Sequence, residues 1–323
     1  MTTARVLVTR ALPAGVDCPP EWAVWPEDRS MPRDMLLAAA AEAEGLLCML
    51  VDTIDSELLE AAPRLRVISQ MAAGVDNVDV EAATAAGVPV GHTPGVLTET
   101  TADTAFALLA VAARRLAEGQ ALLRSGQANE WNPDFLLGAD LHDTTLGVVG
   151  MGSIGTALGH RARGFRMRLL YSGPNRKPEA ESHLGAEHVA FEVLMSTCDH
   201  VILTAPLTPD TYHMVDRAAL ESMRPGATLV NVARGGLIDH DALTDVAGGG
   251  QISVALDVTE PEPLPPDHPL LTLANVIVVP HLGSASVRTR AAMARLAIEN
   301  LEAGLSSRRL VACVNPEVYE QNE

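Results

Sequence analysis

The sequence predicts an α/β protein with two doubly wound domains, each built on a parallel sheet. Three observations support this. The 323 residues exceed what one ordinary hydrophobic core accommodates. Short apolar segments alternate with helical patterns along nearly the whole chain, as in repeated β–α units. A glycine-rich loop also joins one such strand to a helix, at residues 150–155.

Composition restricts both the core and the partners. Apolar residues make up 47% of the chain and aromatic residues only 3%, so Ala, Val, Leu and Gly must build the core. The 41 acidic and 23 basic residues leave a net charge of −18. Because this field repels duplex nucleic acid and anionic membranes, we expect neither as a partner. An anionic ligand would need a local basic patch.

Cysteine usage and the chain's start favour a cytoplasmic protein. The four scattered cysteines show no metal-ligand spacing, so we expect reduced thiols and no metal site. They are Cys18, Cys48, Cys198 and Cys313. The N-terminus reads as the start of a strand rather than a signal peptide. No uninterrupted apolar stretch reaches the roughly 18 residues of a membrane span.

The first part of the chain contains four short apolar segments that predict strands. They are Arg5–Val8, Gly45–Leu50, Leu65–Gln70 and Val88–Gly91. Helical patterns occupy Ser56–Ala62 and Val80–Ala86 between them. The breaker cluster His92-Thr93-Pro94-Gly95 follows the fourth strand. Two further helical patterns come next, Leu97–Arg115 and Leu116–Ser125.

A second series of units begins at the strand Thr145–Val149. Its later strands are expected at Arg168–Tyr171, His200–Leu203, Thr228–Asn231, Ser253–Asp257 and Val276–Val279. A final helix is predicted over Ser286–Gly304, and the tail Val311–Glu323 is expected to be irregular.

The loop Gly150-Met151-Gly152-Ser153-Ile154-Gly155 has the spacing of a dinucleotide-binding loop. The first glycine permits a tight turn, the second lets the backbone approach a pyrophosphate, and the third allows close packing of helix on strand. The helix N-terminus then offers N–H groups and positive dipole to the phosphates. Since a strand precedes the loop and a helix follows it, we expect a bound nicotinamide dinucleotide.

The residues after the next strand indicate which nucleotide is preferred. An NAD site usually carries an acid about 20 residues after the glycines, but no Asp or Glu occurs between Gly150 and Pro178. The strand runs instead into Ser172-Gly173-Pro174-Asn175-Arg176-Lys177. A hydroxyl, an amide and two cations suit a 2′-phosphate, so NADP(H) is predicted and NAD(H) is the alternative. A solvated basic turn is the structural alternative.

Three charged groups follow three later strands. Arg234 comes after Thr228–Asn231, the acidic segment 257–262 follows the next strand, and His281 follows the last. Ligands of open α/β sheets bind at such carboxyl ends. An Arg can grip a carboxylate with two parallel N–H bonds, and a carboxylate favours an imidazolium that donates a proton. Each residue alone could equally be structural, but together they predict a site for a carboxylate-bearing substrate.

At these residues the sequence resembles the D-2-hydroxyacid dehydrogenase family, in particular its glyoxylate/hydroxypyruvate reductase branch. The phrases that carry the resemblance cover nearly the whole chain. Besides the glycine loop they are residues 71–76, 93–98, 203–208, 231–235, 256–265, 268–271 and 280–285. The resemblance implies two Rossmann-like domains with an active-site cleft between them. A discontinuous substrate domain would hold residues 1–97 plus 289–323, and a dinucleotide domain residues 98–288.

The resemblance also implies catalytic roles. Arg234 would bind the substrate carboxylate and 2-oxo group, and His281 would donate the proton during reduction. Glu262 would be the carboxylate partner of His281, with Glu260 as its rival. The N–H groups of Ala73 and Gly74 would grip the carboxylate.

Other residues are assigned to the cofactor and substrate pockets on the same basis. Asp257 and the Val232–Ala233 backbone would hold the nicotinamide amide, with Pro206 under the adenosine side. Thr101 also belongs to the predicted cofactor set, together with Gly150, Gly152, Ser153, Ile154, Gly155, Ser172, Asn175, Arg176 and Lys177. Ser284 would sit beside the catalytic His. The family forms dimers, and Trp131 matches a Trp that closes the neighbouring subunit's pocket.

The expected activity is reduction of hydroxypyruvate to D-glycerate and of glyoxylate to glycolate. One departure concerns the cofactor: where NADP-using members often carry an Arg, this chain has Pro174. Another small D-2-hydroxy acid, including phosphoglycerate, is the alternative substrate, although residues 71–90 contain no Lys or Arg. A cofactor-sensing regulatory protein on the same fold is the alternative from a different class.

Overall fold

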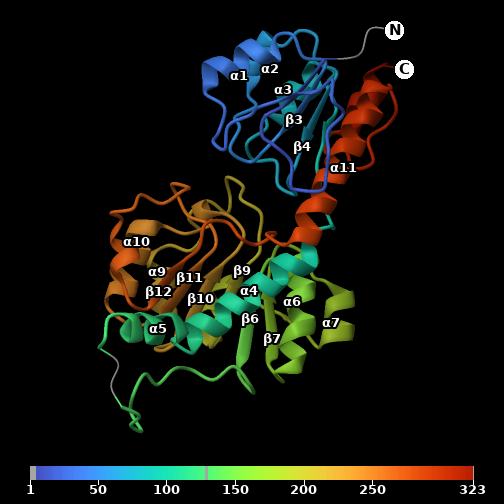
Figure 1. The fold of residues 1–323 in the computed structure, drawn as a ribbon. Coiled ribbons are helices and arrows are strands. Elements are labelled where there is room, and N and C mark those ends of the chain that lie inside the picture. Colours follow the sequence, from blue (N-terminus) through green and yellow to red (C-terminus); the bar gives the residue numbers. More distant parts are fainter. Residues whose placement is uncertain (1–4, 128–129, 323) are drawn as a thin grey trace. The chain divides into compact units, whose positions relative to one another are not determined.

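A computed structural model describes residues 5–127 and 130–322 of the chain. The chain divides into two compact units, Met1–Leu97 with Ser286–Glu323, and Thr98–Ala285. Each unit contains one sheet whose strands all run parallel (Figure 1). The predicted class, α/β with two doubly wound parallel sheets, is therefore confirmed.

The first unit carries a five-stranded sheet in the order β2-β1-β3-β4-β5. Its strands are β1 (Val6–Val8), β2 (Ala23–Val24), β3 (Gly45–Cys48), β4 (Val67–Gln70) and β5 (Val90–Gly91). Its helices are α1 (Arg33–Ala40), α2 (Ser56–Ala61), α3 (Val80–Ala85) and α11 (Val287–Leu305), with the 3-10 helix η3 (Pro316–Asn322) near the C-terminus.

Side chains of α1, α2 and α3 form one apolar cluster with the first sheet. The helix α11 instead packs against β3 and β4, although it lies more than 200 residues away in the sequence (Figure 1). A Cβ at Gly304 of α11 would lie 2.5 Å from Val67 Cβ, so a glycine is what lets helix and strand approach. Ser286 begins this helix by accepting a hydrogen bond from the Thr289 N–H.

The second unit carries a seven-stranded sheet in the order β12-β11-β10-β9-β6-β7-β8. Its strands are β6 (Thr145–Val149), β7 (Arg168–Ser172), β8 (Glu187–His188), β9 (His200–Leu203), β10 (Thr228–Asn231), β11 (Ser253–Leu256) and β12 (Val276–Val278). From β6 the chain first builds outward through β7 and β8, then returns to add β9 on the other side. Ligands of doubly wound sheets bind at this reversal point, at the carboxyl ends of the strands.

Helices cover both faces of the second sheet. They are α4 (Thr98–Ala113), α5 (Leu116–Arg124), α6 (Ser153–Gly164), α7 (Pro178–Leu184), α8 (Phe191–Thr197), α9 (Arg217–Ser222) and α10 (His240–Gly248), with the 3-10 helices η1 (Gly235–Leu237) and η2 (Pro269–Thr272). Side chains of α4, α6 and α7 share one core cluster, and those of α8, α9 and α10 share the other. Strand β9 shows the alternation: Ile202 joins the first cluster, Val201 and Leu203 the second.

The sequence missed edge strands and misjudged the tail. Strand β2 has only two residues, in the short apolar stretch Trp22–Trp25 between prolines, and β8 is the polar pair Glu187–His188. The tail was expected to be irregular, but it is tied to the sheet: Val314 N–H donates to Val90 O at 2.8 Å. The fully buried Asn315 side chain also accepts a hydrogen bond from Val90 N–H.

Within residues 5–127 and 130–322, no helix combines the length and apolarity that a membrane crossing requires. The same residues contain no group of three or more His, Cys, Asp or Glu side chains arranged to hold a metal ion.

Candidate active site

The glycine loop lies at the reversal point of the second sheet. Gly150 follows β6 with a φ of +96°, and a Cβ there would lie 2.6 Å from the backbone nitrogen of Ala205, just after β9. The position thus demands glycine for its left-handed conformation and for the close approach of two strand ends. The Gly150 N–H donates to Ser172 O at 2.8 Å, which ties the loop to the end of β7.

The other two glycines differ in their surroundings. A Cβ at Gly155 would lie 2.6 Å from Gly150 O, whereas a Cβ at Gly152 would meet no atom within 4 Å. Gly155 therefore allows α6 to pack on the loop, and Gly152 leaves the backbone open on a side that protein does not fill. The first turn of α6 carries no acidic residue, and its leading N–H groups have no carbonyl acceptor within the helix. This arrangement fits a phosphate group of a dinucleotide.

The segment after β7 holds the predicted 2′-phosphate residues. Ser172 is buried at the strand end, while Asn175, Arg176 and Lys177 are exposed. The Arg176 guanidinium is engaged by Glu181 of α7, with Nη2 to Oε2 at 2.6 Å and Nε to Oε1 at 3.0 Å. The hydrogen bond from Arg176, together with that from Tyr171, lowers the pKa of Glu181 to about 2.

Arg234 lies in the loop that follows β10. The fully buried Asn231 shapes this loop: its Nδ2 donates to Arg234 O at 2.8 Å and its Oδ1 accepts from Ala233 N at 3.0 Å. The Arg234 Nη1 donates to Ala233 O at 2.7 Å. The backbone of Val232–Ala233, predicted to face the nicotinamide amide, is thus part of the same hydrogen-bonded turn.

The loops after β10 and β11 pack against each other backbone to backbone. A Cβ at Gly235 would lie 2.1 Å from both the carbonyl carbon and the oxygen of Thr259, so only glycine fits without moving the chain. This contact fixes Arg234 relative to the segment Thr259–Glu262.

Glu262 and His281 form a close pair, with Oε1 to Nδ1 at 2.6 Å. Because the carboxylate accepts, Nδ1 carries the hydrogen and Nε2 is left to exchange a proton. The side chains are 39% and 29% exposed, so the pair remains accessible. Glu260, the rival partner, contacts His213 Nε2 instead, at 3.2 Å.

Asp257 holds the turn that carries His281. Its buried carboxylate accepts hydrogen bonds from the N–H groups of Leu282 and Gly283, and its backbone oxygen accepts the His281 N–H at 2.8 Å. Burial raises the pKa of Asp257, and the two backbone hydrogen bonds oppose that shift. The sequence had assigned Asp257 to the nicotinamide; the structure adds that it organises the turn.

Remaining predicted residues lie at several places. Thr101 is buried on α4, where a Cβ at Gly283 would lie 3.4 Å from its Cγ2, and Ser284 is buried beside that glycine. Pro206 follows β9, and its carbonyl accepts a hydrogen bond from Thr211 Oγ1 at 2.8 Å. Trp131 is 87% exposed on the segment after α5.

In the first unit, Ala73 and Gly74 follow β4. The Ala73 carbonyl lies 2.9 Å from His92 Nδ1, and the neighbouring Ala72 carbonyl accepts the Thr93 N–H at 2.8 Å. The segment after β5 therefore braces the turn at which the two predicted N–H donors lie.

Sequence reasoning missed the residues that hold these loops. Nothing in the local sequence marks Asn231, Gly235, His240 or His213 for a structural role. Gly235 stood inside a recognised motif, yet its contact with Thr259 joins segments 24 residues apart. No local pattern identifies such a contact.

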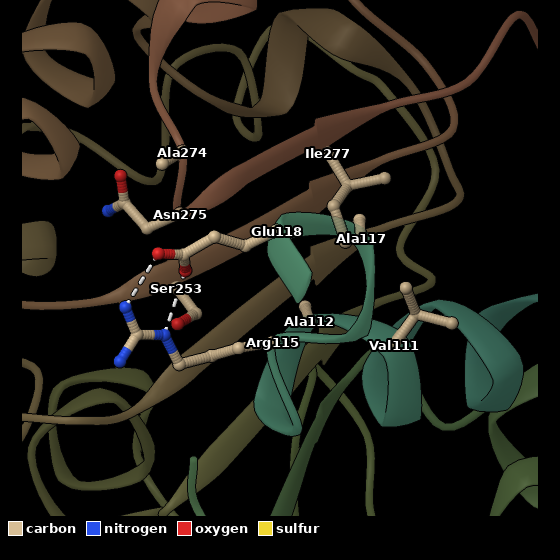
Figure 2. Close-up of a pocket in the computed structure, with 9 residues that line it drawn as sticks. All are labelled: Val111, Ala112, Arg115, Ala117, Glu118, Ser253, Ala274, Asn275 and Ile277. Carbon is tan, nitrogen blue, oxygen red and sulfur yellow. Dashed lines mark hydrogen bonds and ion pairs between the residues drawn. The ribbon is translucent and has the colours of Figure 1, made fainter. Parts of the chain in front are cut away.

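A small cavity lies near the amino-terminal ends of β11 and β12 in the second sheet. It encloses about 10 Å³, room for roughly one water molecule. Figure 2 shows Arg115 and Glu118 facing each other there, with Nε to Oε2 at 2.8 Å, beside Ser253 at the start of β11. Ser253 is the first residue of β11, whereas Asp257 follows its last residue. The cavity is therefore separate from the site described above.

His240 should make the protein less stable in mild acid. Its Nδ1 donates to Ile238 O at 3.1 Å and its Nε2 accepts the Glu260 N–H at 3.4 Å, which requires the neutral ring, and burial lowers its pKa. The unfolded chain therefore binds a proton near pH 6.5 that the folded chain resists, so stability present at neutral pH is lost as pH falls below about 6.5.

The variant His240→Gln, which does not titrate, should reduce this loss by at most about 1.4 kcal/mol per pH unit. Urea denaturation between pH 7.5 and 5 measures it. The buried His200, whose pKa is also lowered, is present in both proteins and cancels. Equal slopes for the two proteins would show that His240 is not held neutral.

Known proteins resemble this chain over nearly its full length. A family model described as D-isomer specific 2-hydroxyacid dehydrogenase, NAD binding domain, matches residues 106–283. A glyoxylate reductase of Korarchaeum cryptofilum is 45% identical over 303 residues, covering 92% of this chain and 91% of the relative.

Solved structures agree. A Thermus thermophilus protein superimposes with a TM-score of 0.88 at 44% identity, covering 96% of this chain and 99% of the other. An NADPH-dependent glyoxylate/hydroxypyruvate reductase of Sinorhizobium meliloti, solved with NADP and malonate, gives a TM-score of 0.80 at 30% identity, covering 96% of each chain. With its glycine loop, its Arg234 turn and its Glu262–His281 pair, the chain belongs to the D-isomer specific 2-hydroxyacid dehydrogenase family.

Proposed function

We propose that this protein reduces small 2-oxo acids to D-2-hydroxy acids, with glyoxylate and hydroxypyruvate as its main substrates and glycolate and D-glycerate as products. The observation that carries the proposal is the 2.6 Å contact between Glu262 and His281. Glu262 lies on the loop after β11, which packs against the loop that carries Arg234. The relatives named glyoxylate reductase support this choice of substrate.

In the proposed mechanism the side chains divide the work. Arg234 holds the substrate carboxylate with its planar fork, and the N–H groups of Ala73 and Gly74 are the other proposed carboxylate donors. Glu262 keeps the hydrogen of His281 on Nδ1, so that Nε2 of the protonated ring would give its proton to the oxygen of the 2-oxo group. Ser284 lies close in sequence to the proton donor.

The residues around Gly152 would hold a nicotinamide nucleotide. When bound, the reduced nucleotide supplies the two electrons of the reduction. The N–H groups of Ser153, Ile154 and Gly155 would meet the phosphates, in a second unit that we take as the dinucleotide domain. We propose a preference for NADP(H) over NAD(H), because β7 ends in Ser172 with no carboxylate there or before Pro178, and the S. meliloti enzyme is NADPH-dependent.

We propose a homodimer in which α5 and the segment after it meet a second copy. None of the residues of α5 is fully buried. The apolar side chains of this region are strongly exposed, Leu116 at 58%, Leu123 at 71%, Trp131 at 87% and Leu137 at 65%. Exposed apolar side chains of this kind support the proposed interface, in which Trp131 would complete the partner's pocket.

Initial rates with glyoxylate, hydroxypyruvate and pyruvate, each with NADPH and with NADH, test the proposed function. We expect the first two substrates to give the higher kcat/KM, and NADPH to be the better cofactor. Faster turnover with NADH would contradict the interpretation of residues 172–177. Tight nucleotide binding without turnover of any 2-oxo acid would instead indicate a regulatory protein.

The acid pair is tested by His281→Gln and Glu262→Gln. Each should lower kcat by about 10²- to 10⁴-fold with either substrate, because the proton donor or its orienting carboxylate is lost. Glu260→Gln is the matched control, since Glu260 lies two residues away and contacts His213. Its kcat should stay within about tenfold of the wild-type value, a smaller loss than the removal of a general acid causes. Near-full turnover by His281→Gln would refute the assignment.

The dimer is tested by light scattering during size-exclusion chromatography. The wild-type mass should be twice that of the 34.1 kDa chain. Leu123→Glu, which places a charge in the proposed interface, should shift the protein toward monomer, while Leu271→Glu, at a 45% exposed position outside this region, should not. A monomeric wild type would contradict the proposal.

A further inference from the structure

The segment after β7 is organised around Glu181. The Tyr171 hydroxyl donates to Glu181 Oε1 at 2.6 Å and accepts the Lys177 N–H, also at 2.6 Å. Tyr171 is fully buried and its ring lies 5.0 Å from that of His188. Glu181 is therefore anchored from the core side, and its side chain is only 20% exposed, against 71% for Arg176.

The contact between Arg176 and Glu181 uses the edge of the guanidinium that also suits a phosphate. Nε and Nη2 both donate to the carboxylate, at 3.0 and 2.6 Å. A planar fork grips a carboxylate or a phosphate through the same two parallel N–H bonds. A phosphate therefore cannot take this edge of Arg176 while Glu181 holds it.

We propose that Glu181 is a specificity-determining residue that competes with the 2′-phosphate of NADP(H) for Arg176 and so limits the preference over NAD(H). This inference rests on the proposed function, because it assumes that the segment faces the ribose of a bound nucleotide. NAD(H) carries no 2′-phosphate and gains nothing when Arg176 is released. Glu181 thus weakens the binding of NADP(H) and leaves the binding of NAD(H) unchanged.

Two features make this competition persistent. Tyr171 keeps the carboxylate in place whether or not Arg176 leaves it. While Arg176 and Tyr171 donate to it, their hydrogen bonds lower the pKa of Glu181 to about 2, so Glu181 is charged at neutral pH and competes as an anion.

The test is Glu181→Gln, whose amide oxygen can still accept from Tyr171 while its charge is gone. Dissociation constants of NADPH and NADH, measured by fluorescence titration at one ionic strength, are the readout. Exposed ion pairs contribute up to about 1 kcal/mol, so the Kd of NADPH should fall by about three- to fivefold. The Kd of NADH should stay unchanged, which also shows that the variant is folded.

Glu179→Gln is the matched control. Glu179 is exposed on the same helix and carries the same charge, so the variant reports the general effect of removing one acid. It should change the ratio of the two dissociation constants clearly less than Glu181→Gln does. Equal changes in the two variants would overturn the proposal in favour of a simple field effect.

The double variant Arg176→Gln/Glu181→Gln shows whether the effect passes through Arg176. If it does, removing Glu181 improves NADPH binding clearly more when Arg176 is present than in the Arg176→Gln background, and the two substitutions are not additive. Additive changes would overturn the inference while leaving the proposed function intact. A wild type that binds neither nucleotide would instead refute the proposed function itself.

Discussion

The proposed chemistry depends on a contact that leaves no room for a side chain. Gly235 lies against the Thr259 backbone, with a would-be Cβ 2.1 Å from the carbonyl. This contact sets the Arg234 turn against the segment that carries Glu262, and Glu262 in turn orients His281. A displacement of about 1 Å can lower a rate a hundredfold. The close backbone contact at Gly235 therefore controls how the carboxylate-binding Arg234 is placed relative to the proton donor His281.

Two buried polar groups hold the same loops. Asp257 uses both carboxylate oxygens on the turn after His281, and Asn231 uses its amide on the turn that carries Arg234. Such groups are costly to bury unless their hydrogen bonds are satisfied. Here they convert the carboxyl ends of neighbouring strands into fixed turns, which is the rigid support that a catalytic geometry requires.

The charge of the protein shapes how it would meet its anionic ligands. A net charge of −18 disfavours anions at long range, so binding must rely on local donors such as helix N-termini and Arg side chains. In the segment after β7, Glu181 already engages one of the two cations. Less positive charge is therefore left for a 2′-phosphate than the sequence Arg176-Lys177 suggests. The proposed cofactor preference then depends on whether Arg176 donates to the Glu181 carboxylate or to the 2′-phosphate.

Local sequence was sufficient to predict the α/β class and the strands Thr145–Val149, His200–Leu203 and Thr228–Asn231, because apolar periodicity and glycine spacing are local. The family was predicted from motifs that resemble those of its members, and the family model confirms it. The resemblance points to Glu262 as the partner of His281, with Glu260 as its rival; spacing alone does not distinguish two acids separated by one proline. The folded chain pairs Glu262 with His281, Glu260 with His213 and Glu181 with Arg176. The first two pairings join residues 19 and 47 positions apart, so they depend on how loops from separate strands pack at the carboxyl ends of the sheet, which local sequence does not encode. The third joins residues only five apart, but it depends on α7 bringing Glu181 back to Tyr171 at the end of β7.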